Sequence, residues 1–256
     1  MLTFITLLLL AIGTLLLARN VQGKNKSRLI TGAVAVLALI LFFWFMDFWG
    51  EKLWFDSVGY SDRFWDLFLF QTGMVAVGAL LSLGIIAGLI SFLPKNKKIL
   101  RLTVASLAFL IGAVWGFSNW DTVLKFWHGV QTGVADPILG KDAGFYLFSL
   151  PFYDTLQNLL FTLAFMGLIA SVIANYRLVR VGNQFELNQA RNVNQNNINR
   201  SIYLNGALIL MLAAADKYLS RFHLLYSDLG VVSGPGWTDV NIILPSLTII
   251  VALTEF

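Results

Sequence analysis

The chain has 256 residues, of which 57% are hydrophobic and only 12% are charged. Soluble domains are about half apolar and about a quarter charged, so this balance excludes an ordinary soluble domain, a disordered chain and a nucleic-acid-binding module. The net charge of +4 fits the cationic cytoplasmic loops of membrane proteins, and the absence of cysteine excludes disulfides and thiolate chemistry.

Apolar segments along the chain predict an all-α, polytopic bundle of about seven membrane-spanning helices. The first, Leu2–Ala18, is followed rather than preceded by cations, which predicts an uncleaved helix with its N-terminus outside. The next five cover residues 29–48, 64–93, 102–119, 156–176 and 201–215. The last, Asn241–Phe256, is short and contains Pro245, so we expect a chain truncated within a helix.

Charge differs between alternate connections of this predicted bundle. Lysine and arginine gather in residues 19–28, 95–101 and 177–200, whereas most of the acidic residues lie in the other three connections. The positive-inside rule therefore predicts basic loops in the cytoplasm and a multi-pass protein of the cell membrane. Residues 181–200 are rich in Asn and Gln, which predicts a solvated connector beside the lipid headgroups.

The three predicted outer connections are rich in aromatic residues. In the first, Trp54 and Tyr60 belong to an expected interfacial belt, and Gly59 favours a tight turn. The second begins at Trp120 with apolar residues at steps of three and four, which predicts a helix lying in the membrane interface. In the third, Thr238 or Asp239 is expected to cap a helix that starts at about Val240.

The remainder of the second connection combines turn residues with an apolar run. Asp136-Pro137 and Gly140 are turn residues. Aromatic residues follow them, and they are too apolar for a free loop, so we expect them to dock back onto the mouth of the bundle. These aromatic residues are Phe145, Tyr146, Phe148, Phe152 and Tyr153.

Three runs in these outer connections resemble the hallmarks of uncharacterised protein family 0182, in order, over about residues 29–256. The first run is Leu53-Trp-Phe-Asp-Ser-Val-Gly-Tyr60 with Phe64-Trp65. The second is Asp136-Pro137, Gly140, Asp142 and Phe145-Tyr-Leu-Phe-Ser-Leu-Pro-Phe-Tyr153. The third is Leu224-Leu-Tyr-Ser227, Gly230-Val231, Gly234, Thr238-Asp239-Val240 and Leu244-Pro245.

The resemblance implies a large bacterial or archaeal integral membrane protein, with about seven crossings followed by a large extracytoplasmic region. Residues 1–28 would then be an additional N-terminal helix and cytoplasmic loop ahead of the family-like bundle over residues 29–256. Pro235-Gly236-Trp237 departs from the family pattern, so that turn is expected to differ. The family brings no established catalytic residue or ligand, and we predict no cofactor, metal or catalytic site.

The leading hypothesis is a non-enzymatic membrane anchor or scaffold, in contact with membrane lipid, whose outer loops dock its own extracytoplasmic domain or a protein partner. The candidate docking positions are Trp54, Tyr60, Trp127, Asp136, Asp142, Phe145, Tyr146, Tyr226 and Asp239.

Other hypotheses remain open. A transporter or channel for an apolar or lipid-like solute would need a cavity lined by Gln71, Asn158 or Asn205. An enzyme acting on lipid or envelope polymer would use Asp136, Asp142 or His223, and the first two of these are also weak candidates for Ca²⁺. Gly84 and Gly88 form a GxxxG step, which predicts close helix packing within the bundle.

Overall fold

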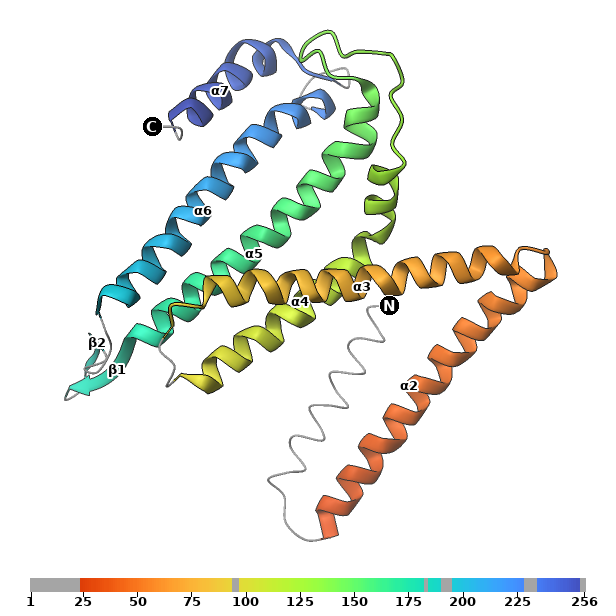
Figure 1. Cartoon of the computed structure of the whole chain (residues 1–256), viewed down its shortest axis with the longest axis vertical. Helices are drawn as coiled ribbons and strands as arrows, with labels where there is room; N and C mark the ends of the chain where they lie inside the picture. Colours follow the sequence, from red (N-terminus) through yellow and green to blue (C-terminus); the bar gives the residue numbers. More distant parts are fainter. Residues whose placement is uncertain (1–23, 94–96, 182–183, 190–194, 228–233, 254–256) are drawn as a thin grey trace. The chain divides into compact units, whose positions relative to one another are not determined.

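The computed structural model describes residues 24–93, 97–181, 184–189, 195–227 and 234–253, and it is nearly all helical (Figure 1). The chain divides into two compact units, Met1–Leu69 and Phe70–Phe256, which are described separately below. The elements are α2 (Lys24–Ser57), α3 (Ser61–Leu89), α4 (Lys98–Trp127), the π-helical turn η1 (Phe145–Ser149), α5 (Leu150–Asn175), β1 (Tyr176–Val181), β2 (Gln184–Gln189), α6 (Gln195–His223), the 3₁₀ turn η2 (Leu224–Tyr226), the π-helical turn η3 (Asp239–Ile243) and α7 (Leu244–Leu253).

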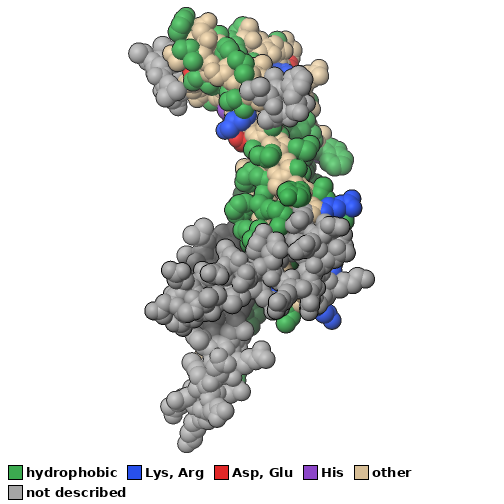
Figure 2. All heavy atoms as spheres, turned by 90° about the vertical axis from the view of Figure 1, so that its left-hand side faces the viewer, with side chains coloured by type: hydrophobic (Ala, Val, Ile, Leu, Met, Phe, Trp, Pro, Cys, Tyr) green, Lys and Arg blue, Asp and Glu red, His purple; other side chains and the backbone are tan. Residues whose placement is uncertain are grey.

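Among the described residues, five helices are long and apolar enough to cross a membrane. They are Ile30–Ser57, Ser61–Leu89, Lys98–Trp127, Phe145–Ala174 and Arg200–Tyr226, and a shorter apolar helix covers Asp239–Ile250. The predicted first span, Leu2–Ala18, lies outside the described residues. On the face drawn in Figure 2, apolar side chains are widespread over the described surface, and charged side chains are few.

The predicted interfacial helix beginning at Trp120 is wrong, because this segment is the continuation of α4, which runs without a break to Trp127. No glycine or proline lies between Phe117 and Trp127, so nothing in the sequence stops the helix where its hydropathy falls. The polar residues are accommodated within the helix. Asn119 donates to the carbonyl of Trp115 at 2.9 Å, and Lys125 pairs with Asp121 at 3.1 Å.

The prediction of helices alone needs a second correction in the basic connection after α5. There β1 and β2 form an antiparallel pair, with Tyr176 opposite Gln189 and Val181 opposite Gln184. Apolar and polar residues alternate along β2, from Phe185 to Asn188, which is the period of a strand. Part of the expected connector is therefore a short hairpin.

In the first unit, α2 and the start of α3 are joined by a tight turn at Gly59, as predicted. Gly59 has φ +78°, a left-handed conformation that glycine adopts without a Cβ clash. The N–H of Tyr60 donates to the carbonyl of Phe55 at 2.9 Å, and the hydroxyl of Ser61 donates to Asp56 at 2.7 Å. Rings from both helices pack around the turn, and these are Phe48, Phe55, Phe64, Trp65 and Phe68.

The second unit is built around α5, which packs against α4 and α6, while α7 packs on α6 (Figure 1). Its core contains buried side chains from α3, α4 and α5 and from the residues that follow α3. They are Ile86, Ile90, Leu93, Val104, Ala108, Leu159, Leu163, Ala170 and Ala174. The side chains of Leu210 and Met211 on α6 are about 70% exposed, as expected of a surface that faces lipid.

The C-terminal part of α3 crosses α4 at glycines. A Cβ built on Gly78 would overlap the carbonyl oxygen of Gly112, and one on Gly116 would overlap that of Met74. The predicted GxxxG step is not part of this contact, because a Cβ on Gly84 or Gly88 would meet no atom within 4 Å. Small residues allow two helices to approach closely, and here Gly78, Gly112 and Gly116 do so.

Polar side chains buried in the second unit connect helices to one another. The indole of Trp115 on α4 donates to the carbonyl of Thr155 on α5 at 2.9 Å. The amide of Asn205 on α6 is 1% exposed, and it donates to the carbonyl of Ser201 at 2.8 Å and to the hydroxyl of Ser171 on α5 at 3.4 Å. Asn205 therefore lies within packed helices, whereas Asn158, another residue considered for a cavity lining, is exposed.

Replacing Asn205 by alanine is expected to lower the free energy of unfolding by about 1–2 kcal/mol, since it removes the buried hydrogen bond to Ser171, which joins α6 to α5, and a second buried hydrogen bond within α6. Titration with SDS in mixed micelles would measure the change. The matched control is Asn158→Ala, for which a change below about 0.5 kcal/mol is expected at an exposed position. Equal effects of the two substitutions would contradict the assigned role of Asn205.

Candidate functional site

Four chain segments of the second unit meet at one end, which we call the loop end: the end of α4 with the loop over residues 128–144, the start of η1, the end of α6 with η2, and the start of η3 (Figure 1). Six of the candidate docking residues are in these segments, in addition to Trp127 at the end of α4: Asp136, Asp142, Phe145, Tyr146, Tyr226 and Asp239. The other two candidates, Trp54 and Tyr60, belong to the first unit.

The carboxylate of Asp142 holds the first part of the 128–144 loop. One oxygen accepts the N–H of Thr132 at 3.0 Å and that of Gly144 at 2.7 Å, and the other accepts the N–H of Gly133 at 2.8 Å. The hydroxyl of Thr132 adds a fourth donor at 3.2 Å. A single side chain thus binds the backbone at Thr132 and Gly133 and also at Gly144, farther along the loop.

Asp136 organises the next turn and fastens it to the helix that follows. Its carboxylate accepts the N–H groups of Ile138 at 3.1 Å and Leu139 at 2.7 Å, and also the phenolic hydroxyl of Tyr146 at 3.0 Å. Gly140 completes the turn with φ +67°, and its N–H donates to the carbonyl of Asp136 at 2.9 Å. The predicted turn at Asp136 and Gly140 is therefore confirmed.

Both carboxyl groups are held in their ionised form. Burial acts to raise the pKa of Asp136, but its three donors outweigh that effect and hold the pKa below its ordinary value. For Asp142 the backbone N–H of Thr132 has the largest influence and lowers the pKa, and burial opposes it less strongly. Each of the four carboxylate oxygens accepts at least one donor from the chain, and no group of three or more possible metal ligands occurs among the described residues.

Aromatic side chains after the loop dock back onto the helix ends, as predicted. The ring of Phe126 at the end of α4 stacks on Phe152, with centroids 4.2 Å apart. Tyr146 is buried with Leu150 and Phe222, and Phe145 packs on Phe222 with ring centroids 4.9 Å apart. These contacts join α4, α5 and α6 at the loop end.

The end of α6 contributes two residues whose positions were not predicted from the sequence. The Nε2 atom of His223 lies 2.9 Å from a carboxylate oxygen of Asp154 on α5. The guanidinium of Arg221 lies 4.1 Å from the ring centroid of Tyr218, and its Nε donates to the carbonyl of that residue at 3.3 Å. Asp154 and His223 are 69 positions apart in the sequence, so no local pattern indicates this pairing.

Asp239 caps the final helix from inside it. The helix begins at Trp237, and the carboxylate of Asp239 reaches back to accept the N–H of Gly236 at 2.9 Å, which is the geometry of half a capping box. Asp239 is 3% exposed, and its second oxygen has no hydrogen-bond partner. The predicted cap is thus provided by Asp239, while Thr238 makes no side-chain capping bond.

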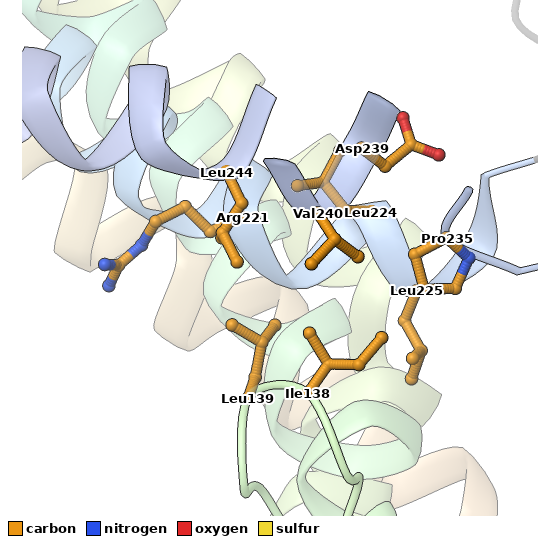
Figure 3. Close-up of a pocket in the computed structure, with 9 residues that line it drawn as sticks. All are labelled: Ile138, Leu139, Arg221, Leu224, Leu225, Pro235, Asp239, Val240 and Leu244. Atoms are coloured by element: carbon orange, nitrogen blue, oxygen red, sulfur yellow. The ribbon is translucent and has the colours of Figure 1, made fainter. Parts of the chain in front are cut away.

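A half-open recess lies between the 128–144 loop, the end of α6 and the start of the last helix (Figure 3). It is shallow, with a volume of about 10 Å³, which is room for about one water molecule. Apolar side chains form most of its lining, with Arg221 and Asp239 at its edges pointing in different directions (Figure 3). The apolar lining residues are Ile138, Leu139, Leu224, Leu225, Pro235, Val240 and Leu244.

Comparison with known proteins shows one family. The model of an uncharacterised protein family, UPF0182, matches residues 28–256. A UPF0182 protein of Cupriavidus necator is 34% identical over 258 residues, covering 91% of this chain and 28% of the relative. A UPF0182 protein of Mycolicibacterium gilvum is 32% identical, covering 92% and 26%.

Another relative, a UPF0182 protein of a Synechococcus species, is 30% identical and is covered to the same limited extent, 85% of this chain and 25% of the relative. The chain therefore spans about a quarter of the length of the curated relatives it matches. No solved structure matches the chain.

Proposed function

The chain belongs to the uncharacterised protein family UPF0182, and we propose that it acts as a multi-pass membrane anchor whose loop end docks an extracytoplasmic domain or a partner subunit. In this proposal the protein is a scaffold rather than an enzyme. Its surface works by burying apolar area against the docked polypeptide.

The proposed topology has about seven crossings of the cell membrane, with the N-terminus outside and the basic connections in the cytoplasm. Five long apolar helices support it, together with the shorter apolar helix at Asp239–Ile250. The distribution of lysine and arginine between alternate connections supports the sidedness. This arrangement puts the loop end on the extracytoplasmic side.

The observation that carries the docking proposal is a firmly held loop that exposes large apolar side chains. Trp127 is 79% exposed, and Val130 and Val134 are each 66% exposed. Asp142 binds the backbone between these valines and the start of η1. The loop is therefore already ordered, and binding a partner would cost little conformational entropy of its backbone. Exposed apolar patches with polar rims are typical of interaction sites.

The lengths of the relatives support a docked polypeptide. This chain corresponds to about a quarter of each of the curated relatives cited above, and the resemblance to the family implies a large extracytoplasmic region after the helical bundle. We propose that such a region, in the same polypeptide or in a partner subunit, covers Val130 and Val134.

The double substitution Val130→Asp and Val134→Asp is expected to release the docked polypeptide. Cross-linking in native membranes, followed by purification of the protein, would measure the cross-linked fraction, and we expect a fall of about tenfold or more. The physical reason is that the aspartates would place unpaired charges in an apolar contact.

The matched control is Gln131→Asp, which adds a charge in the same loop without removing an apolar side chain, and it is expected to leave most of the cross-linking intact. If the native protein cross-links to no polypeptide and has no covered surface at Val130 and Val134, the docking proposal is wrong.

A further inference from the structure

We infer that the second unit binds anionic phospholipid at the end opposite the loop end, through a basic cluster of four exposed or half-buried side chains. The basic cluster consists of Lys97, Lys98 and Arg101 around the start of α4 and Arg200 near the start of α6. This inference does not rest on the docking of a polypeptide, because that proposal concerns the loop end.

The parts of the chain that carry the basic cluster meet at one end of the second unit. There α5 ends, and α4 and α6 begin (Figure 1). One buried apolar core joins Leu93, which follows α3, to Val104 on α4 and Ala174 on α5. The guanidinium of Arg200 lies 4.9 Å from the ring centroid of Phe92, which brings the start of α6 to the same place. The four cations therefore lie on neighbouring helix ends.

The positive charge of the basic cluster is not neutralised within the described structure. None of its four side chains forms an ion pair with an acidic side chain among the described residues. The first turn of α4 contains no acidic residue. Residues 95–101 and 177–200 together hold eight lysines and arginines and a single acid, Glu186. Clustered charge of one sign attracts an anionic counterpart, and Lys98 and Arg200 are exposed to one.

Apolar side chains beside the basic cluster indicate that lipid tails begin at the first turns of α4. Ile99 is 83% exposed and Leu102 is 67% exposed. Both lie away from the core, into which Leu100 and Val104 pack. The helix Lys98–Trp127 is long and apolar enough to cross a membrane, so exposed apolar residues on it are expected to contact lipid tails.

Cations at this depth can reach lipid phosphates. Lys98 and Arg101 are each one residue away from an exposed apolar side chain, which is about 1.5 Å along the helix axis. Lysine and arginine near a helix end extend their charged heads to the headgroup layer, while their stems stay in apolar surroundings. One phospholipid can therefore contact a cation with its phosphate and Ile99 or Leu102 with an acyl chain.

Anionic phospholipid accounts for both the charged and the apolar side chains. A soluble acidic protein or a free phosphate would pair with the cations but leave Ile99 and Leu102 in water. A zwitterionic lipid would cover these two residues, but its own cation would be repelled by the basic cluster. Basic residues beside a membrane-spanning helix strengthen the binding of anionic lipid by about fivefold each.

The test is native mass spectrometry of the full chain, purified in detergent and mixed with equal amounts of phosphatidylglycerol and phosphatidylcholine. We expect the wild type to retain phosphatidylglycerol over phosphatidylcholine by about fivefold or more. The double substitution Lys98→Gln and Arg101→Gln is expected to lower this preference by about fivefold or more, whereas Lys98→Arg with Arg101→Lys should keep it. Arg200→Gln removes a cation from a different helix and should lower the preference by about fivefold.

The matched control is Lys125→Gln with Lys217→Gln, which removes the same amount of charge from cations already paired with Asp121 and Asp216. It is expected to change the preference by less than about twofold, because exposed ion pairs are weak and neither cation belongs to the basic cluster. Thermal unfolding would show that each variant is folded. A photoreactive residue at Ile99, introduced in native membranes, is expected to capture phospholipid.

Three outcomes would overturn the inference. The first is a wild-type preference in both the Lys98 and Arg101 double variant and Arg200→Gln, and the second is an equal loss in the control. The third is capture of a polypeptide rather than lipid at Ile99. An excess of inorganic phosphate should leave the bound lipid in place, since it cannot replace the acyl contacts, and its displacement would assign the basic cluster to a free anion instead.

Discussion

A leucine in place of Gly112 is expected to lower the free energy of unfolding by about 3 kcal/mol or more, the upper part of the range for overpacked sites. The backbone of α3 leaves no room at this position, because a Cβ on Gly112 would overlap the carbonyl of Gly78 and the side chain of Ser82. The clash is with backbone, which has no alternative rotamer, so the helices must separate. Titration with SDS in mixed micelles measures the change.

Gly84→Leu and Gly88→Leu are the matched controls, since they make the same substitution on α3 where a Cβ would meet no atom within 4 Å. Each is expected to change the free energy of unfolding by less than about 1 kcal/mol. The higher helix propensity of leucine is itself stabilising at these two positions. A larger loss at Gly84 or Gly88 than at Gly112 would refute the helix crossing described above.

The second large effect is expected at Asp142, where alanine would release the first part of the 128–144 loop. Its carboxylate accepts the N–H groups of Thr132, Gly133 and Gly144. Without it these amides should exchange hydrogen roughly tenfold faster or more, because hydrogen bonds to charged groups are the strong ones and local opening limits exchange. Hydrogen exchange followed by mass spectrometry would measure the change.

Acid should have the same effect on the wild-type loop. The pKa values of Asp136 and Asp142 are lowered in the folded protein, so the order they provide is fully present above their ordinary value near 3.8 and is lost as the pH falls below it, through the lowered values. Limited proteolysis of the loop between pH 6 and pH 2 would follow the transition. Cleavage that is independent of pH over this range would contradict the role given to the two carboxylates.

The sequence was informative about the helices because their apolar runs are long, but it was less informative about where they end. A span over residues 102–119 is predicted, but α4 extends over Lys98–Trp127. The predicted span ends where hydropathy falls at charged residues, whereas the helix continues until it approaches Gly129. The β1–β2 hairpin was missed because its composition is polar, and the alternation at Phe185–Asn188 is short.

At the loop end, features that depend on neighbouring residues were predicted, whereas contacts between residues far apart in the sequence were not. The turn at Asp136 and Gly140 is local chemistry, and it was predicted. The pairing of Asp154 with His223 depends on how α5 and α6 lie side by side, which no local pattern records. Likewise, α3 crosses α4 at Gly78 rather than at Gly84 because Gly78 lies opposite the glycines of α4. The sequence of α3 alone does not contain that information.

The glycine crossing of α3 and α4 also bears on how material moves past the protein. Where Gly78 meets Gly112, the two main chains touch, and neither a hydrocarbon tail nor a water molecule fits between them. At that level the two helices are in direct contact, with no gap between them. A permeation route through the second unit therefore cannot pass between α3 and α4 at the level of Gly78 and Gly112.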